Sequence, residues 1–158
     1  MPETRRWART VHSIGRSPPL NVALFAFLLN LPWELMQVPL YARMEQASHW
    51  KGIVTCSQAA LGDAVLAVLA YAAVAVTSKS RRWIESPRAT QVAAFVGVSV
   101  LVTIVIENLA TRGLWISSWT YAPSMPIVPG TGAGLAPLLQ WLLLPPVVVW
   151  LVQRQIQR

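Results

Sequence analysis

Three acidic residues lie in apolar stretches of this sequence that are long enough to cross a membrane. They are Glu34, Asp63 and Glu107, and they are half of the six acidic residues in the chain. A carboxylate at the centre of a bilayer costs at least ~2.5–3.5 kcal/mol on insertion scales, so such residues usually face a protein interior or a water-filled cavity. The three residues therefore predict a built polar site, and they are its candidate catalytic residues.

Several kinds of chemistry fit such a site. A carboxyl group kept neutral in an apolar pocket can serve as a general acid, and an ionised neighbour can serve as the base. Three carboxylates with amide oxygens can instead hold a hard cation or relay protons. In a purely structural alternative, the polar groups bond to one another at about 0.6–2 kcal/mol per bond and hold the helices together. The residue types leave these alternatives open.

Amides and indole rings accompany the three acids. Asn30, Glu34 and Gln37 are spaced by four and three residues, so they share one face of a helix. Because a face of amide and carboxylate groups is incompatible with lipid, we expect it to point into a helix bundle. The candidate substrate-binding residues are Asn30, Trp33, Gln37, Asn108, Trp115, Trp119, Gln140 and Trp141.

The elements that must position these residues are four apolar stretches, each long enough for a helix of about 20 residues across a bilayer. They cover approximately residues 20–41, 55–77, 90–110 and 135–152. The sequence therefore predicts an all-α, polytopic membrane protein that forms a four-helix transmembrane bundle. Residues 1–158 form a single domain, and the loop 113–134 connects the last two spans.

The composition supports a membrane protein. The chain is 54% hydrophobic and only 12% charged, whereas soluble domains carry roughly 25% charged residues. The net charge of +7 does not predict a nucleic-acid partner, because the basic residues flank the apolar stretches as orientation signals do. Cys56 is the only cysteine, so an intrachain disulfide is excluded. No metal site is expected, and the sequence leaves any cofactor unknown.

The flanking charges predict an orientation. Arg43, Lys51 and Arg112 fall on one side of the predicted spans, and the other basic residues fall on the opposite side. Those others are Arg5, Arg6, Arg9, Arg16, Lys79, Arg81, Arg82, Arg88, Arg154 and Arg158. Cytoplasmic loops of membrane proteins carry an excess of Lys and Arg, so we expect both termini to be cytoplasmic and the protein to lie in the plasma (inner) membrane.

This orientation places the polar residues at one depth. With a rise of ~1.5 Å per residue, Glu34, Asp63, Glu107 and Gln140 all fall in the extracytoplasmic half, within roughly a 10 Å band. The loop above them is rich in Trp, Pro and Gly and includes Trp115. It would serve as an aromatic anchor at the headgroups or as a lid over the site.

Two short motifs resemble the small integral-membrane lycopene cyclase domains that occur as heterodimer subunits. The segment Leu31-Pro32-Trp33-Glu34 is similar to a Pro-Trp-acid segment of a spanning helix in that family. Glu107, followed by Gly113-Leu114-Trp115, is similar to an acid followed by a Gly-x-Trp stretch. The family also has a Pro-x-Glu-acid pair in a later helix, where this chain has Pro137-Leu138-Leu139-Gln140. The resemblance implies acid-base chemistry on an isoprenoid.

These observations lead to one expectation about function and two alternatives. We expect an intramembrane carboxylate site near the extracytoplasmic side that carries out acid–base chemistry on a lipidic or isoprenoid-like substrate. The expected partner is thus a membrane lipid or an apolar small molecule, and a homo- or hetero-oligomer is left open. The alternatives are a cation or proton carrier that uses the same carboxylates, and a structural or assembly subunit of a membrane complex.

Overall fold

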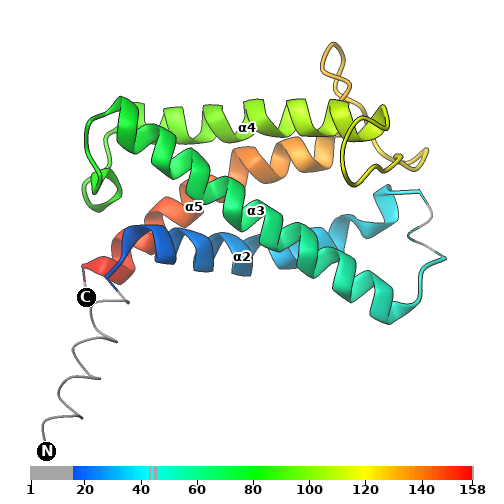
Figure 1. Cartoon of the computed structure of the whole chain (residues 1–158), viewed down its shortest axis with the longest axis horizontal. Coiled ribbons are helices and arrows are strands. Elements are labelled where there is room, and N and C mark those ends of the chain that lie inside the picture. Colours follow the sequence, from blue (N-terminus) through cyan, green and yellow to red (C-terminus); the bar gives the residue numbers. More distant parts are fainter. Residues whose placement is uncertain (1–15, 43, 45, 158) are drawn as a thin grey trace, which may run out of the picture.

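The computed structural model describes residues 16–42, 44 and 46–157, and most of these residues are helical. The long helices are α2 (Pro18–Gln37), α3 (His49–Thr77), α4 (Ala89–Thr111) and α5 (Leu135–Ile156) (Figure 1). Two short 3₁₀ turns, η1 (Val38–Leu40) and η2 (Trp83–Glu85), follow α2 and α3. Within the described residues, extended pairing is limited to two isolated bridges.

Two helices differ in extent from the predicted spans. Helix α3 begins at His49 rather than at Thr55, because Ser48 caps it and its Oγ accepts the Lys51 amide at 3.3 Å. Helix α2 ends at Gln37, and the chain continues into η1, in which Pro39 lacks the N–H that an α-helix would need. The first predicted span therefore ends in a different conformation from the one expected.

The four long helices form a ring in cross-section. Helix α2 packs against α3 and α5, and α4 packs against the same two helices. Figure 1 shows α3 crossing in front of α5, with α2 and α4 on either side of the crossing. Polar side chains on any of the helices can therefore meet near the axis of the bundle.

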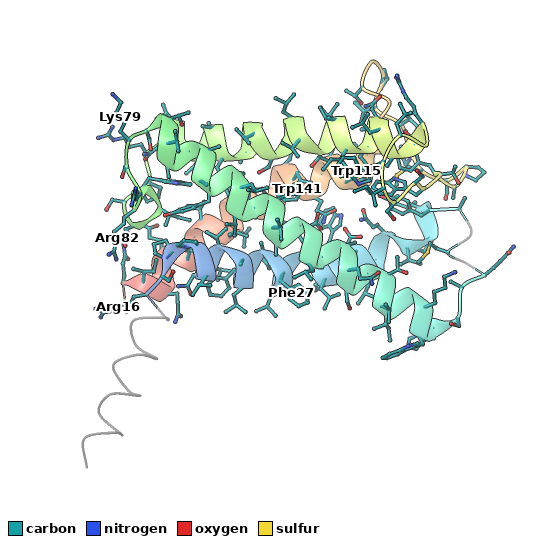
Figure 2. All side chains as sticks on the ribbon, viewed as in Figure 1. Arg16, Phe27, Lys79, Arg82, Trp115 and Trp141 are labelled. Atoms are coloured by element: carbon teal, nitrogen blue, oxygen red, sulfur yellow. The ribbon has the colours of Figure 1, made fainter. Side chains whose placement is uncertain are left out.

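The two ends of the bundle differ in charge. The basic end carries the start of α2, the connection 78–88 and the end of α5, and the loop end carries the connections 41–48 and 112–134 (Figure 1). Figure 2 shows Arg16, Lys79 and Arg82 together at the basic end. Lys51 and Arg112 are the described cations towards the loop end. The predicted orientation also used Arg5, Arg6, Arg9, Arg43 and Arg158, which lie outside the described residues.

An apolar core fills the half of the bundle next to the basic end. The Trp83 ring stacks on Tyr71 with centroids 5.6 Å apart and meets Phe95 at 5.8 Å. Trp83 Nε1 also donates to the Tyr71 carbonyl at 3.2 Å, which holds η2 under the end of α3. Val22 and Val152 are fully buried in the same cluster.

The outer surface of the bundle is apolar, while several of its buried residues are polar. Leu24, Leu61 and Leu101 are more than half exposed, whereas Asn30 and Gln140 are almost completely buried. Four helices among the described residues are long and apolar enough to cross a membrane. At ~1.5 Å per residue, even the shortest of them, with 22 residues, matches a hydrocarbon core of about 30 Å.

Candidate functional site

The amide of Gln140 joins three helices near the axis of the bundle. Its Nε2 donates to Asn30 Oδ1 at 2.6 Å and Glu34 Oε1 at 3.1 Å, both on α2. It also donates to Asp63 Oδ2 on α3 at 3.0 Å. One nitrogen of α5 therefore brings two carboxyl groups from different helices to the same point.

The two carboxyl groups also influence each other. Glu34 Oε1 and Asp63 Oδ2 lie 3.1 and 3.0 Å from the same Gln140 nitrogen, and because two carboxyl groups this close resist ionising together, one of them holds a proton. Glu34 Oε1 accepts a second amide hydrogen, from Gln37 Nε2 at 2.8 Å. Because donors to a carboxylate favour its ionised form, the geometry makes Glu34 the anionic member of this pair.

Gln37 has an unused acceptor. Its Oε1 is the only buried side-chain nitrogen or oxygen among the described residues that has no hydrogen-bond partner. The side chain is 5% exposed. Leaving such an acceptor unpaired costs about 1–3 kcal/mol, so a hydroxyl group or water that donated to it would bind favourably beside Glu34.

Local features of α2 orient the polar face formed by Asn30, Glu34 and Gln37. The N–H that Pro32 lacks leaves the carbonyl one turn earlier without its usual helical donor. Asn30 Nδ2 donates back to the Ala26 carbonyl at 2.7 Å, which fixes its Oδ1 towards Gln140. The Cys56 thiol lies 3.6 Å from the Glu34 carbonyl oxygen and links the last turn of α2 to α3.

Glu107 belongs to a second polar group, formed by α4 and the loop 112–134. Its Oε2 accepts Trp119 Nε1 at 3.0 Å and also accepts the Tyr121 hydroxyl. The Tyr121 oxygen in turn accepts the Gly134 amide at 2.8 Å. Burial, followed by the hydrogen bond to Glu107, raises the pKa of Tyr121 well above its ordinary value. The phenol therefore remains a donor to Glu107 through neutral pH.

Tyr41 connects the two polar groups. Its ring centroid is 5.7 Å from that of Tyr121 and 6.3 Å from that of Trp119. Backbone bonds of 2.9 Å from Ala42 to Thr120 and from Ala122 to Leu40 hold the loop 112–134 against the end of α2. The pKa of Tyr41 is raised by burial first, and then by its carboxyl neighbours, with Glu107 ahead of Glu34 and Asp63. The pKa of Tyr41 therefore depends on all three acids.

Asn108 fixes the far part of the same loop. Its Nδ2 donates to the Ile104 carbonyl at 2.8 Å and to the Thr131 carbonyl. Gly132 has a φ of +69°, and a Cβ there would lie 2.9 Å from Asn108 Oδ1. The close approach therefore requires glycine at this position.

The structure brings together only part of the predicted set. Asn30, Glu34, Gln37, Asp63 and Gln140 form one cluster, and Glu107 with Trp119 forms the neighbouring one. Two further aromatic residues belong to the Glu107 group and were not among the predicted site residues: Tyr121, which donates to Glu107, and Tyr41, whose ring contacts Trp119 and Tyr121. In the sequence, the only indication of a role for these two tyrosines is that each follows an apolar span that contains a carboxylate.

The remaining predicted residues lie elsewhere. Trp141 packs in the apolar core, where it lines a cavity of about 10 Å³ together with Phe95 and with Asn30 at the edge of the cluster. Trp115 is 38% exposed on the loop, and its carbonyl accepts the Ser118 hydroxyl. Trp33 is half-buried, and in the described part of the chain its ring makes no hydrogen bond or ring contact. Asn108 anchors the loop instead of facing the Glu34 cluster.

Fold and site together define an all-helical bundle with membrane-length helices and a carboxyl-rich interior at its loop end. Comparison with models of protein families, with curated proteins and with solved structures finds no match to this chain. Within the described residues, no group of three or more His, Cys, Asp or Glu side chains is arranged to hold a metal ion.

Proposed function

We propose that this chain is a multi-pass protein of the plasma (inner) membrane whose loop-end carboxyl groups carry out acid–base chemistry on a lipidic or isoprenoid-like substrate. The basic end would face the cytoplasm, as the positive-inside rule requires. The apolar outer surface and the helix lengths support insertion. The charge difference between the two ends supports the orientation.

The observation that carries the proposal is the Gln140 amide shared by Glu34 and Asp63. Two carboxyl groups that share a donor and one proton can act as an acid and a base. In this assignment Asp63 gives a proton to an alkene of the substrate, which forms a carbocation. Glu34 then removes a proton from a neighbouring carbon, which forms a new alkene. The step is an isomerisation that needs neither oxidant nor reductant.

The surroundings of the pair suit an apolar substrate that becomes transiently cationic. The rings of Tyr41, Trp119 and Tyr121 lie on the loop side of the cluster, and aromatic faces stabilise cations. Within this substrate class we propose an acyclic polyene as the first candidate, because the Pro32-Trp33-Glu34 segment resembles lycopene cyclase domains. The unpaired Gln37 Oε1 would hold a water or a polar substrate end beside Glu34.

The apolar half of the bundle favours this function over a carrier. The cluster of Val22, Phe95, Trp83 and Val152 lies between the carboxyl groups and the basic end. A carrier would need polar groups along the whole path, whereas the polar side chains buried in that half, Asn21, Gln91 and Ser99, bond to backbone groups three or four residues away in the chain. Reconstituted protein should therefore show no proton or cation flux that depends on Glu34 or Glu107, and such a flux would instead support a carrier.

The experiment follows solvent hydrogen into the product. Purified protein in liposomes is incubated with lycopene in D₂O, and the products are separated and their masses are measured by mass spectrometry. Proton addition followed by proton loss predicts one deuterium in each isomerised molecule. Glu34→Gln and Asp63→Asn should each lower the rate by about 10²–10⁴-fold. Glu85→Gln is the matched control, because Glu85 pairs with Arg82 at the basic end. Full activity in both site variants would refute the assignment.

A further inference from the structure

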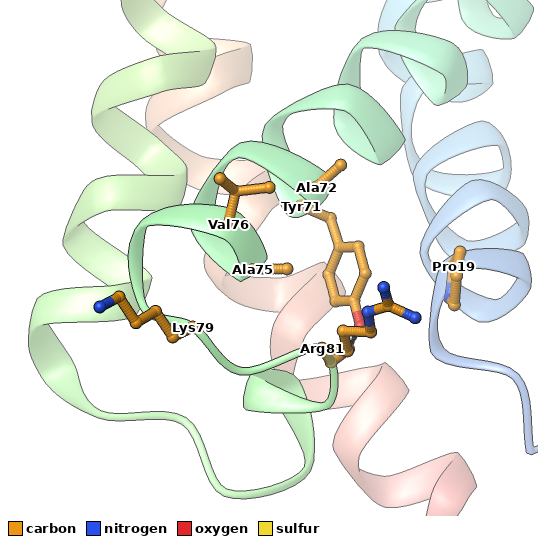
Figure 3. Close-up of a pocket in the computed structure, with 7 residues that line it drawn as sticks. All are labelled: Pro19, Tyr71, Ala72, Ala75, Val76, Lys79 and Arg81. Atoms are coloured by element: carbon orange, nitrogen blue, oxygen red, sulfur yellow. Dashed lines mark hydrogen bonds between the residues drawn. The ribbon is translucent and has the colours of Figure 1, made fainter.

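A groove at the basic end opens beside the start of α2 and the last turns of α3. Its volume is about 610 Å³, and its walls include Pro19, Tyr71, Ala72 and Val76 (Figure 3). Val76 is 76% exposed, so the groove faces the outer surface of the bundle and not the carboxyl cluster. The groove is thus separate from the proposed catalytic site.

Two cations line the groove but point in opposite directions. Figure 3 shows the Arg81 side chain reaching past the Tyr71 ring towards Pro19, whereas the Lys79 side chain points away from that ring. The Tyr71 hydroxyl donates to the Arg81 carbonyl, which holds this part of the connection in place. Among the described residues the only ion pair is Arg82 with Glu85, so neither groove cation has a carboxylate partner there.

We propose that this groove binds an anionic phospholipid, with its phosphate at Arg81 and an acyl chain along the apolar wall. From Thr77, the last residue of α3, back to Ala72 the helix rises about 8 Å at ~1.5 Å per residue, which matches the upper part of an acyl chain. Basic pockets between helices on the cytoplasmic side are typical sites for anionic headgroups. A free phosphate would leave the apolar wall unused. The inference rests on the proposed insertion and orientation, but not on the chemistry of Glu34 and Asp63.

The test is native mass spectrometry of the full chain in detergent, titrated with phosphatidylglycerol and with phosphatidylcholine of the same acyl chains. Wild-type protein should bind phosphatidylglycerol more tightly. Arg81→Gln should weaken that binding about fivefold, at the usual contribution of a cation near an anionic headgroup, and Lys79→Gln should weaken it less. Arg81→Lys keeps the charge and should retain the preference.

The controls separate the groove from the general charge of the basic end. Arg154→Gln removes one cation from the same end, where Arg154 lies 5.1 Å from the centroid of the Trp150 ring and outside the groove, so it should leave binding unchanged. Val76→Trp should fill the groove and weaken both lipids. Equal affinity for the two lipids, or an equal loss in Arg154→Gln, would overturn the proposal. Unchanged binding in Val76→Trp would overturn the acyl-chain part.

The same titration distinguishes this inference from the proposed function. Glu34→Gln should lose turnover and keep its preference for phosphatidylglycerol. If Arg81→Gln lost the preference for phosphatidylglycerol and kept full turnover, the result would support lipid binding in the groove independently of the proposed chemistry. Release of wild-type protein from membranes by alkaline carbonate would contradict the insertion on which both proposals rest.

Discussion

The two halves of this bundle are held together by different forces. Towards the basic end, Trp83, Tyr71 and Phe95 pack ring against ring, as in the core of a soluble protein. Towards the loop end, Gln140 and Glu107 each gather hydrogen bonds from other segments. Apolar side chains pack stably wherever their shapes fit together. Buried carboxyl groups also need specific hydrogen-bond partners, because burial without a partner destabilises the fold. The proposed function accounts for this contrast, because acid–base chemistry requires carboxyl groups at the loop end and the other half of the chain packs without them.

The largest expected effect is on the apolar half. Trp83→Ala should cost about 4 kcal/mol of stability, since it removes a buried indole and leaves a cavity. It also removes the bond from Nε1 to the Tyr71 carbonyl. Reversible unfolding in mixed micelles measures the loss. Trp150→Ala is the control, because Trp150 is 52% exposed, and an equal cost in the two variants would remove the distinction between core and surface.

The second effect is on the polar half. Gln140→Leu should cost roughly 3 kcal/mol, because Asn30 Oδ1, Glu34 Oε1 and Asp63 Oδ2 all lose the donor they share. The same unfolding assay measures it against Leu139→Ala, whose side chain is 38% exposed. If Gln140→Leu is as stable as wild type, the hydrogen bonds of the cluster contribute nothing, and the two halves would not differ as described.

A smaller effect concerns the anchoring of the loop 112–134. Gly132→Ala should cost about 1 kcal/mol more than Gly130→Ala. Both glycines have a positive φ, but only a Cβ at Gly132 would meet Asn108 Oδ1, at 2.9 Å. Hydrogen exchange of the loop amides should therefore accelerate more in Gly132→Ala. Equal exchange in the two variants would show that the contact with Asn108 does not hold the loop.

The smallest effect is the part of the pH dependence that comes from Tyr121 at the loop end. The folded-state pKa of Tyr121 is raised by burial and by Glu107, so above pH ~10 the unfolded chain releases this proton before the folded one. Stability should fall as the pH rises from there, with the effect reduced by the partial exposure of the ring. Tyr121→Phe should make the fall shallower. An unchanged slope would mean that the phenol is not buried against Glu107.

The sequence predicted the four long helices and the inward face of α2, because apolar length and i, i+3, i+4 spacing are local properties. It also predicted one depth for Glu34, Asp63, Glu107 and Gln140, since topology and helical rise determine depth. Gln140 bonds to Glu34 and Asp63, whereas Glu107 bonds to Trp119 in the neighbouring group. The beginning of α3 at His49 depends on a cap at Ser48, which the hydropathy pattern does not register.

The partners of each acid could not be predicted in the same way. The depth of a residue in the membrane does not determine which helices are neighbours. Helices α2 and α4 each pack on α3 and α5, and this arrangement separates Glu107 on α4 from the Gln140 cluster. The positions of Trp141 and Tyr121 could not be predicted from the sequence either. The first is beside Gln140 in sequence yet packs in the core, while the second reaches Glu107 from a loop.

The central claim is that the cluster around Gln140 is where an apolar substrate is held. Mass spectrometry of the small molecules retained after gentle detergent extraction tests it most directly, with wild type, Gln140→Leu and Glu85→Gln prepared in parallel. We expect an unsaturated, isoprenoid-like lipid to be retained by wild type and Glu85→Gln and lost from Gln140→Leu. An identical set of retained molecules in all three proteins would contradict it.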